Sequence, residues 1–232
     1  IIGGAAVPEA MIREFRDNHD VDVIQGWGMT EMSPLGTVST PKSGTENLSP
    51  DEMISLKAKA GRGICGVEMR IVDDEGKELP RGAGKAGNIC IQNPWPGMFQ
   101  TIWGDRDRFV TNYFERYCKN PKSTDWRDWP YLTGDAAVEA PDGYYRILGR
   151  IDDVINVSGH RLGTKELESA ALVVEEVAEA AVVPVADDIK GVVPDLYVAL
   201  KPGFEASDAV AKKINDALVS EIGPIAKPGF EA

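Results

Sequence analysis

The chain has 232 residues, 43% of them hydrophobic, and a formal net charge of −12. This hydrophobic fraction is enough for a packed core and excludes a disordered protein, and the length suits one large domain or two small ones. The acidic balance argues against a surface for nucleic acid or for an anionic membrane. With no signal peptide and no long apolar run, the sequence predicts an acidic, soluble, cytoplasmic protein without integral membrane association.

The cysteines and histidines do not indicate a metal site. Cys65, Cys90 and Cys118 lie far apart, are odd in number and lack the spacing of metal ligands. They are expected to be free thiols, buried or half-buried, in a reducing compartment. His19 and His160 are too few and too far apart for a metal site, and His160 is expected to be exposed or structural rather than a general base.

The N-terminal quarter is expected to contain one helix and one short strand. A helix is predicted over 8–19, where Pro8 suits the first turn. A short apolar strand over 21–24 then leads into a glycine-rich loop over 25–31. Residues 41–61 are polar and are predicted to be irregular.

The middle of the chain is expected to form strands joined by turns. Alternating hydrophobicity predicts strands over 64–72 and 88–92, with a turn at 74–77 between them. Residues 93–130 are rich in Trp, Pro and Arg and are predicted to be a loop with one short helix. A hairpin follows, closed by the strong turn pair at 142–143.

After Arg150 the pattern changes to one that predicts βα units. Helices are predicted over 164–176 and 207–222, and strands over 179–185 and 195–200. Ser207 and Asp208 suit the start of the second helix. Each helix carries an apolar face, formed by Leu167, Ala170, Ala171 and Val174 in the first and by Val210, Ile214, Ala217 and Leu218 in the second.

The segment 131–166 combines residues that suit a nucleotide. Asp135 follows a tight turn, and an ionised Asp can accept hydrogen bonds from both hydroxyls of a ribose. Arg150 and Arg161 stand in glycine-containing stretches, and a guanidinium presents a planar fork that matches phosphate. Two arginines and one aspartate held by glycine turns predict a nucleotide-binding site.

Four motifs of this chain resemble those of the adenylate-forming superfamily, which includes acyl-CoA synthetases, firefly luciferase and peptide-synthetase adenylation domains. TGD at 133–135 and the GRxDDxIxxxGxR pattern at 149–161 are similar to two of its signatures. QGWGMTE at 25–31 is similar to its QGYGxTE motif, and GGAA at 3–6 more weakly resembles its adenine loop. The motifs stand in the family's order, and the resemblance covers essentially the whole chain.

The resemblance implies an α/β (mixed α+β) fold in two parts. Residues 1–149 would be the C-terminal portion of a large AMP-binding domain, and 150–232 a truncated, small and mobile C-terminal domain. Asp152 matches the hinge position. The implied reaction has two steps: ATP and a carboxylate give an acyl-adenylate and pyrophosphate, then the small domain rotates and a thiol, usually that of coenzyme A, attacks the acyl carbon.

The resemblance also implies roles for the residues of the glycine-rich loop. Trp27 matches an aromatic residue that stacks on adenine, with a core tryptophan as the alternative. Thr30 matches a residue that hydrogen-bonds the α-phosphate, and Glu31 a carboxylate that holds Mg²⁺, a cation that prefers oxygen. For this pair the alternative is an ordinary helix start with Thr as the cap. Residues implied to bind ATP or AMP are Gly4, Ala5, Ala6, Gln25, Gly26, Trp27, Thr30, Asp135, Arg150 and Arg161.

Roles in the second half of the chain follow in the same way. Asp135 matches the ribose-binding aspartate, with a simple turn residue as the alternative. Arg150 matches an arginine on the ribose and phosphate, with a surface ion pair as the alternative, and is grouped with Thr30 and Glu31 as catalytic. Ser158 and Gly159 resemble residues that face coenzyme A, where Gly159 would admit the pantetheine; for Gly159 a plain turn is the alternative.

The acid substrate is the least determined property, because the two halves of the chain resemble different branches. From about Pro94 the chain resembles acetyl- and propionyl-CoA synthetases, and before it medium-chain acyl-CoA ligases. Gly28 decides the prediction: short-chain enzymes carry a Trp there that closes the acyl pocket, and each extra CH₂ buried in an apolar pocket contributes roughly 0.8 kcal/mol. We therefore expect a medium-chain or branched fatty acid, with acetate or propionate as the alternative.

The chain is also expected to be a fragment that is inactive and poorly soluble alone. The family's phosphate loop and catalytic-lysine segment are not found in it, KPGFEA occurs at both 201–206 and 227–232, and Leu218–Glu221 lacks the basic residue that short-chain enzymes use near coenzyme A. Two other functions stay open. One is an adenylation domain that loads a carrier-protein thiol, and the other is a non-catalytic nucleotide-binding module. The oligomeric state is open, with a homo-oligomer as one alternative.

Overall fold

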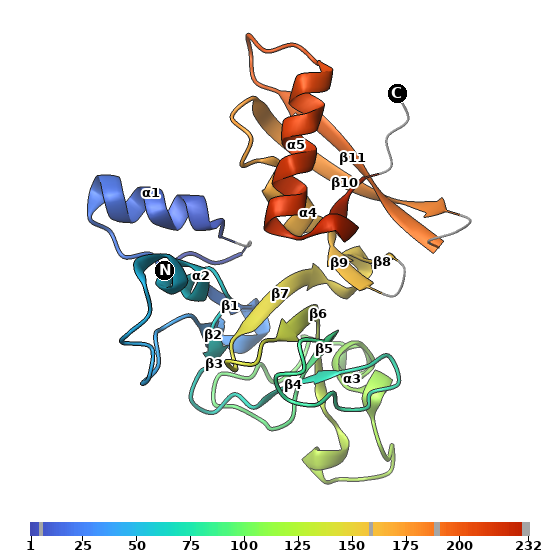
Figure 1. Ribbon diagram of the computed structural model, residues 1–232. Helices are drawn as coiled ribbons and strands as arrows, with labels where there is room; N and C mark the ends of the chain where they lie inside the picture. The colour runs from blue at the N-terminus through green and yellow to red at the C-terminus, as the bar shows by residue number, and fades with distance from the viewer. Residues whose placement is uncertain (5–6, 158–159, 188–190, 229–232) are drawn as a thin grey trace. The chain divides into compact units, whose positions relative to one another are not determined.

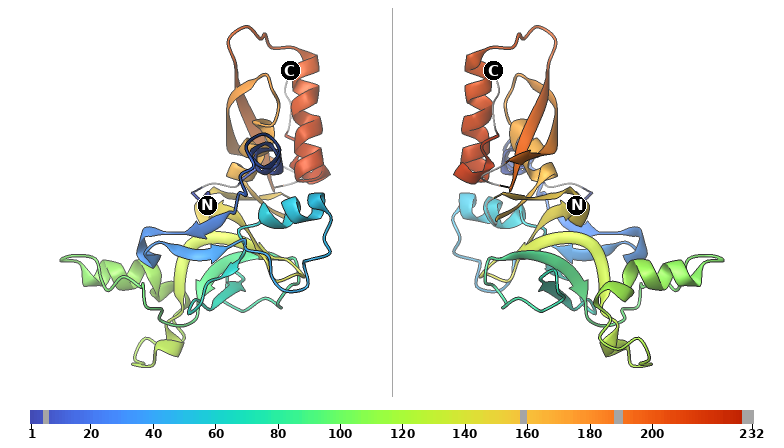
Figure 2. Two further views of the ribbon diagram at one scale, coloured as in Figure 1. Left: turned by 90° about the vertical axis from the view of Figure 1, so that its left-hand side faces the viewer. Right: turned by 90° about the vertical axis from the view of Figure 1, so that its right-hand side faces the viewer.

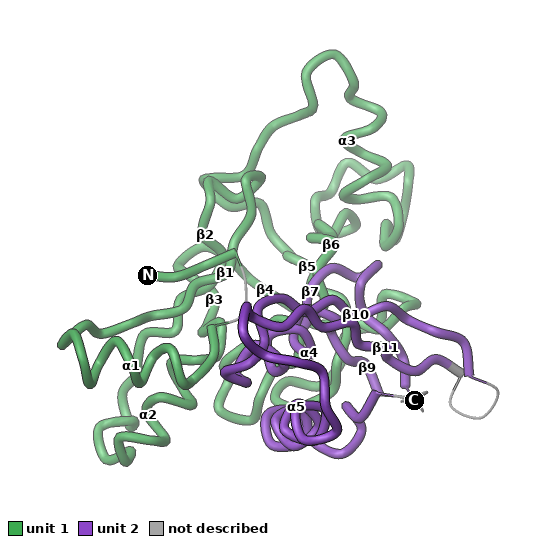
Figure 3. Tube along the Cα trace, turned by 90° about the horizontal axis from the view of Figure 1, so that it is seen from above, with its two compact units in different colours: residues 1–147 green, residues 148–232 purple. Residues whose placement is uncertain are grey.

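The computed structural model describes residues 1–4, 7–157, 160–187 and 191–228 (Figure 1). The chain divides into two compact units, Ile1–Ile147 and Leu148–Ala232, which Figure 3 shows in two colours. The division lies close to the boundary at residue 149 that the motifs predict. Each unit has its own core and is described by itself. Which domains of a synthetase they represent stays a prediction.

The first unit begins with helices and a small antiparallel sheet (Figure 1). A small core between the first two helices and the segment before the sheet is formed by Val7, Ile12, Val23 and Ile54. In chain order the elements are α1 (Glu9–His19), β1 (Gly26–Gly28), the 3₁₀ helix η1 (Thr30–Met32), β2 (Leu35–Val38), α2 (Pro50–Lys57) and β3 (Arg62–Gly63).

A second, four-stranded sheet supplies the main core of this unit. Its strands are in the order β4–β5–β6–β7, and β4–β5 and β5–β6 pair antiparallel. Strand β7 carries the chain from the first unit into the second. The elements are β4 (Met69–Val72), β5 (Ala86–Ile91), α3 (Arg106–Tyr113), the 3₁₀ helices η2 (Glu115–Tyr117) and η3 (Trp126–Asp128), β6 (Tyr131–Glu139) and β7 (Tyr145–Arg150).

The second unit is a four-stranded sheet with two helices. The strand order is β10–β11–β8–β9, and every neighbouring pair is antiparallel. Leu167, Ile214 and Leu218 of the helices pack with strand residues in one core, and both views of Figure 2 show α5 alongside the β10–β11 hairpin. The elements are η4 (Ile151–Asp153), β8 (Val154–Val157), β9 (His160–Gly163), α4 (Thr164–Ala171), β10 (Val177–Asp187), β11 (Gly191–Leu200), α5 (Asp208–Glu221) and η5 (Pro224–Ala226).

The two helices and two strands predicted after Arg150 are confirmed as α4, β10, β11 and α5, with changed bounds. They do not form repeated βα units, because β8 and β9, and β10 and β11, pair antiparallel as hairpins. Helix α4 ends at Ala171 rather than at 176, although Val174 is buried as predicted. The start of α5 is confirmed, because the Ser207 side chain accepts a hydrogen bond from the Val210 N–H.

Two strand predictions in the first unit need correction. The segment 21–24 forms no strand, and the residue that follows it, Gln25, forms an isolated bridge with Ile2. The segment 64–72 forms a strand only from Met69, because a turn precedes it in which Gly66 adopts a φ of +88°. In these segments the apolar pattern marked burial only in part, since Val23 and Val67 are buried but Val21 is exposed, and it did not mark a hydrogen-bonded ladder.

A helix was missed between 41 and 61. Helix α2 starts with a capping box in which Ser49 and Glu52 each bond the other's backbone N–H, and Pro50 occupies its first turn. The Cys65 thiol is exposed, not buried or half-buried as expected, whereas Cys90 is buried and Cys118 half-buried. Within the described ranges, no helix has the length and hydrophobicity to cross a membrane.

Candidate nucleotide-binding site

The structure brings the first two motifs side by side. The Ile2 N–H donates to the Ile24 carbonyl oxygen at 2.9 Å, and the Gly26 N–H donates to the Ile2 carbonyl oxygen at 2.9 Å. A Cβ at Gly3 would lie only 2.9 Å from the Gly26 carbonyl oxygen, so glycine permits this close approach. Gly4 follows, exposed, with a φ of +92°. The predicted residues Ala5 and Ala6 lie outside the described residues.

Gln25 is a buried member of the second motif. Gln25 is 5% exposed. Its N–H donates to the Ser39 Oγ, and its carbonyl oxygen accepts from the Ser39 N–H. Its side-chain oxygen Oε1 is buried and has no hydrogen-bond partner within the described residues. Such an acceptor could be satisfied by an N–H of a bound group. A nucleotide contact by Gln25 stays a prediction.

Trp27 and Asp135 meet directly. The indole Nε1–H of Trp27 donates to Asp135 Oδ2 at 2.9 Å, across 108 positions of sequence. Trp27 is 7% exposed and lies so close to Gly36 that a Cβ there would be 2.5 Å from the indole ring. The indole is therefore part of the core, which is the alternative that the sequence left open, and it holds the carboxylate of the predicted ribose ligand.

Asp135 is held by the backbone of β6 as well. Its N–H donates to the Thr133 Oγ1 at 3.2 Å, and that hydroxyl donates to the Ile89 carbonyl oxygen at 3.1 Å on the neighbouring strand β5. Gly134 between them has a φ of +79°, which glycine adopts without strain. The half-buried carboxylate is thus oriented by Trp27 and by its own strand.

Glu31 is hydrogen-bonded to a tyrosine of an aromatic cluster. The Tyr113 hydroxyl donates to Glu31 Oε1 at 2.8 Å, and the Tyr113 ring stacks on Tyr131 with centroids 5.3 Å apart and planes 6° apart. The Phe99 N–H donates to the Glu31 carbonyl oxygen at 3.1 Å. Sequence reasoning missed Tyr113. One sequence signal was available. Helix α3 and its C-cap carry three aromatic residues, Phe109, Tyr113 and Phe114, which indicate packing against other aromatic side chains.

Thr30 begins the 3₁₀ helix η1 and is exposed. Met29, not Thr30, is the N-cap residue, and no side chain caps this helix. The alternative role of Thr30 as a helix cap is therefore excluded, and its hydroxyl lies at the surface next to Glu31.

Gly28 stands at a point where two segments of backbone nearly touch. A Cβ at Gly28 would lie 2.0 Å from the Pro34 carbonyl oxygen, and the pairing of β1 with β2 changes register between Trp27 and Gly28. The Met29 N–H donates to the same oxygen at 2.7 Å. Backbone packing alone explains glycine at this position, so the absence of a side chain there is no measure of the acyl pocket.

The remaining predicted residues belong to the second unit. Arg150 ends β7 and is exposed, Asp152 is exposed on η4, and Arg161 is half-buried on β9. Arg150 and Arg161 each have interaction partners. Ser158 and Gly159 lie outside the described residues. The site roles of these residues stay predictions.

Two family models match the chain. Residues 1–103 match the AMP-binding enzyme family, and residues 166–232 match the C-terminal domain of AMP-binding enzymes. The chain belongs to the AMP-binding enzyme family. The resemblance to the adenylate-forming superfamily is thereby confirmed.

Relatives of this AMP-binding chain are enzymes named acetyl-coenzyme A synthetase. The protein from Caulobacter vibrioides is 42% identical over 229 residues, which are 98% of this chain and 32% of the relative. That from Alkalilimnicola ehrlichii is 42% identical over 206 residues, or 89% of this chain and 29% of the relative. The chain thus spans about a third of the length of these relatives.

Solved structures confirm the mixed α/β fold of the AMP-binding chain. The anthranilate CoA ligase AuaEII in complex with anthranoyl-AMP superposes with a TM-score of 0.72 at 25% identity, over 97% of this chain and 38% of that one. The o-succinylbenzoate CoA synthetase of Bacillus subtilis, bound to its acyl-adenylate, gives a TM-score of 0.71 at 22% identity, over 98% of this chain and 40% of that one. At 22% identity, the superposition on the Bacillus subtilis enzyme shows only that the fold is shared.

Proposed function

We propose that this chain serves an AMP-forming acyl-CoA ligase whose acid is acetate or another short-chain carboxylate. The carboxylate oxygen attacks the α-phosphorus of ATP and pyrophosphate leaves; the coenzyme A thiol then attacks the acyl carbon and AMP leaves. The observation that carries the proposal is the Trp27–Asp135 contact, which joins two adenylate-forming motifs at one place. Relatives that are 42% identical and named acetyl-coenzyme A synthetase support the same reaction.

Within this proposal the first unit binds the nucleotide. Asp135 accepts hydrogen bonds from the ribose hydroxyls, and Trp27 orients that carboxylate. The adenine binds next to Gly4 and the loop at 25–31, two stretches that are joined through the backbone bonds of Ile2 with Ile24 and Gly26. Because the indole of Trp27 is 7% exposed, stacking on adenine would use only an edge of the ring or follow a local shift of the loop. Thr30, exposed next to Glu31, bonds the α-phosphate.

Glu31 is the residue that fits Mg²⁺. Mg²⁺ in nucleotide enzymes is commonly held by one or two carboxylates together with substrate phosphates. Glu31 provides one such carboxylate, and the described residues contain no cluster of three or more Asp, Glu, His or Cys side chains that would form a separate metal centre. When bound, Mg²⁺ would neutralise phosphate charge, while Glu31, oriented by Tyr113, holds its place.

The second unit would supply the thiol-transfer step. Arg150 contacts the ribose and phosphate, Asp152 is the hinge, and Ser158 and Gly159 face coenzyme A, with Arg161 on a phosphate. Small-molecule partners are therefore the acid, ATP and coenzyme A. The free cysteines fit a reducing, cytoplasmic location.

The choice of a short-chain acid replaces the expectation of a medium-chain one. That expectation rested on Gly28 leaving room for a longer acyl group. Since a Cβ at position 28 would lie 2.0 Å from the Pro34 oxygen, the backbone itself accounts for glycine. The names of the relatives then weigh in favour of acetate.

Acid-dependent AMP formation tests the proposal, measured on a purified synthetase of which this chain forms about a third, because the chain alone is expected to be inactive. With ATP, Mg²⁺ and coenzyme A, kcat/KM for acetate should exceed that for hexanoate by roughly tenfold or more, since an apolar pocket discriminates about that much per methylene. Asp135→Asn should raise the KM for ATP, whereas Asp125→Asn at an exposed turn should not. A preference for hexanoate would restore the medium-chain reading, and AMP binding without acid-dependent turnover would favour a non-catalytic nucleotide module.

A further inference from the structure

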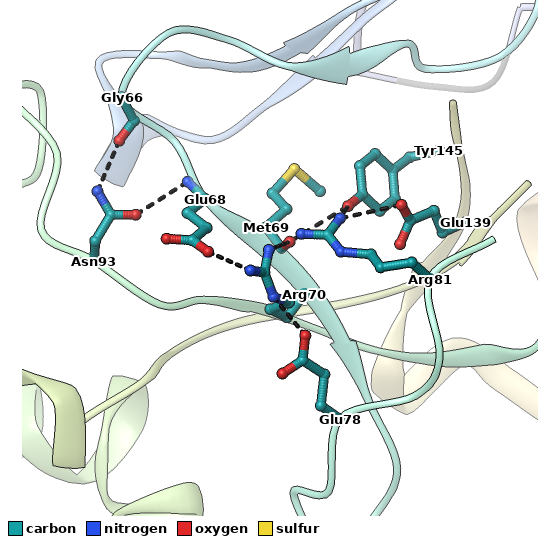
Figure 4. Close-up of polar contacts among 9 residues, drawn as sticks. All are labelled: Gly66, Glu68, Met69, Arg70, Glu78, Arg81, Asn93, Glu139 and Tyr145. Carbon is teal, nitrogen blue, oxygen red and sulfur yellow. Dashed lines mark hydrogen bonds and ion pairs between the residues drawn. The ribbon is translucent and has the colours of Figure 1, made fainter. Parts of the chain in front are cut away.

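A groove of about 550 Å³ opens on the first unit, and none of its lining residues belongs to the proposed nucleotide site. Three arginines line it, Arg62, Arg70 and Arg81, with Glu68 as the one carboxylate among its lining residues. Its volume is in the range of pockets that hold small organic molecules. Figure 4 draws the polar contacts of Arg70, Arg81 and their neighbours. The lining thus carries excess positive charge in a chain whose net charge is −12.

Arg70 bonds the Met69 carbonyl oxygen directly, and Arg81 is linked to it through the Tyr145 hydroxyl. Arg70 Nη1 donates to the Met69 carbonyl oxygen at 3.0 Å. The Tyr145 hydroxyl donates to the same oxygen at 3.4 Å and accepts from Arg81 Nη1 at 2.7 Å. Figure 4 shows the two guanidinium groups pointing toward each other across Met69. Two like charges brought this close repel unless anionic groups compensate them.

Carboxylates form ion pairs with Arg70 and Arg81. Arg81 Nη1 donates to Glu139 Oε1 at 3.1 Å, and Arg70 pairs with Glu78 as well as with Glu68. Glu139 and Glu78 are not among the residues that line the groove. They position the guanidinium groups of Arg70 and Arg81 and offset their charge, so Arg62 is the lining arginine whose charge no ion pair offsets within the described residues.

The guanidinium groups keep donors for a ligand. Both side-chain bonds of Arg81 come from its Nη1 atom, and a guanidinium has five N–H donors. The Arg62 side chain is exposed; within the described residues it forms no ion pair or hydrogen bond, and its contact is with the Tyr144 ring at 5.6 Å. Burial raises the pKa of Tyr145 to about 12, so this hydroxyl stays neutral and does not repel an anion.

Glycines leave part of the wall without side chains. Gly66 and Gly143 line the groove with φ of +88° and +79°, and no atom lies within 4 Å of a Cβ built at Gly143. A ligand can therefore reach backbone as well as the arginines.

We propose that this groove binds a small molecule with two or more oxyanionic groups, phosphate or carboxylate, held by Arg62 and Arg81 with Arg70 beside them. The planar forks of arginine match both kinds of group. The proposal does not depend on the proposed ligase activity, because none of its residues belongs to the nucleotide site.

Calorimetric titration of the purified protein, without Mg²⁺ and with AMP present to occupy the nucleotide site, tests the groove. Pyrophosphate is the phosphate probe and citrate the carboxylate probe. Saturable one-to-one binding of at least one probe is expected, and Arg62→Gln should weaken it about tenfold or more, as expected for loss of charge-assisted hydrogen bonds. The exposed, ion-paired Arg127 provides the control, and Arg127→Gln should change the affinity less than about twofold.

The two probes separate the sources of the anion. Binding of pyrophosphate alone assigns a phosphorylated ligand, and binding of citrate alone a polycarboxylate. Because the Arg62 side chain forms no hydrogen bond or ion pair within the described residues, Arg62→Gln should change the melting temperature little. Arg81→Gln should weaken binding too, with its stability measured in parallel. Failure of both probes to bind, or equal weakening by Arg127→Gln, would overturn the proposal.

Discussion

At the scale of single residues, contacts between distant motifs decide what the candidate site can do. Trp27 was expected to serve adenine directly, yet its indole is buried and its N–H holds Asp135. Tyr113, to which the motifs assign no role, holds Glu31 in the same way. In both cases an aromatic side chain with a polar tip, anchored in the core, orients a carboxylate.

Tyr113→Phe tests the orienting role of this hydroxyl. The ring and its stacking on Tyr131 are kept, but the 2.8 Å bond to Glu31 is lost. We expect the Mg²⁺ concentration for half-maximal activity to rise about 10- to 100-fold, the usual effect of removing a partner of a metal ligand. Binding of Mn²⁺ in the presence of ATP, followed by electron paramagnetic resonance, should weaken in parallel.

The control for this variant is Tyr117→Phe, which removes another buried hydroxyl. Tyr117 accepts from Asn88 and donates to the Asp73 carbonyl oxygen, away from Glu31. It should lower stability without changing the Mn²⁺ signal. An unchanged Mn²⁺ affinity in Tyr113→Phe would show that Glu31 is held by other contacts or binds no metal.

The cysteines should differ in reactivity with pH. Burial raises the pKa of the Cys90 thiol to about 12, so at pH 8 only about one molecule in ten thousand carries the reactive thiolate. Cys65 is exposed. Ellman's reagent at pH 8 should therefore modify Cys65 rapidly and Cys90 only after unfolding. Rapid labelling that persists in Cys65→Ser and is mapped to Cys90 by mass spectrometry would contradict the burial.

At the scale of elements, local sequence signals worked where side chain and backbone interact within a few residues. Ser207 caps α5 as predicted. The same logic would have found α2, since Ser49 and Glu52 have the spacing of a capping box and Pro50 suits the first turn. The helix was not predicted because residues 41–61 are mostly polar and were expected to be irregular. Strand boundaries were less predictable, because a strand is defined by a partner far away in sequence.

Ser49→Ala tests how much the capping box stabilises α2. The Ser49 hydroxyl accepts from the Glu52 N–H, and Glu52 returns a bond to the Ser49 N–H. Removing the hydroxyl should lower the free energy of unfolding by about 1 kcal/mol, as measured by chemical denaturation. Ser49→Asp, which can still accept the bond, should recover most of the loss; if both variants behave like the unmodified protein, the cap contributes nothing to global stability.

At the scale of the whole molecule, the chain has separate cores in its two units. The first unit packs around the sheet of β4 to β7, and the second around Leu167, Ile214 and Leu218. A division of this kind permits one unit to open while the other stays folded. A two-step reaction in which a small domain rotates would also require separate cores.

Leu167→Ala should destabilise the second unit by about 2–5 kcal/mol, because Leu167 is 1% exposed and its truncation leaves a cavity. Hydrogen exchange measured by mass spectrometry should show faster exchange in β10 and β11. Peptides from β5 and β6 should keep their protection. Equal loss of protection in both units would mean that they unfold as one cooperative structure.

The sequence by itself determined the family, the order of the motifs and the residue types at the site, because these depend on local patterns of side chains. It also determined the apolar faces of the helices, which follow from helical periodicity. Only the tertiary structure decided that the strands after Arg150 form antiparallel hairpins, that Tyr113 reaches Glu31, and that the Pro34 backbone requires glycine at position 28. Each of these depends on groups that are distant in sequence and meet only when the chain folds, so no local pattern carries them.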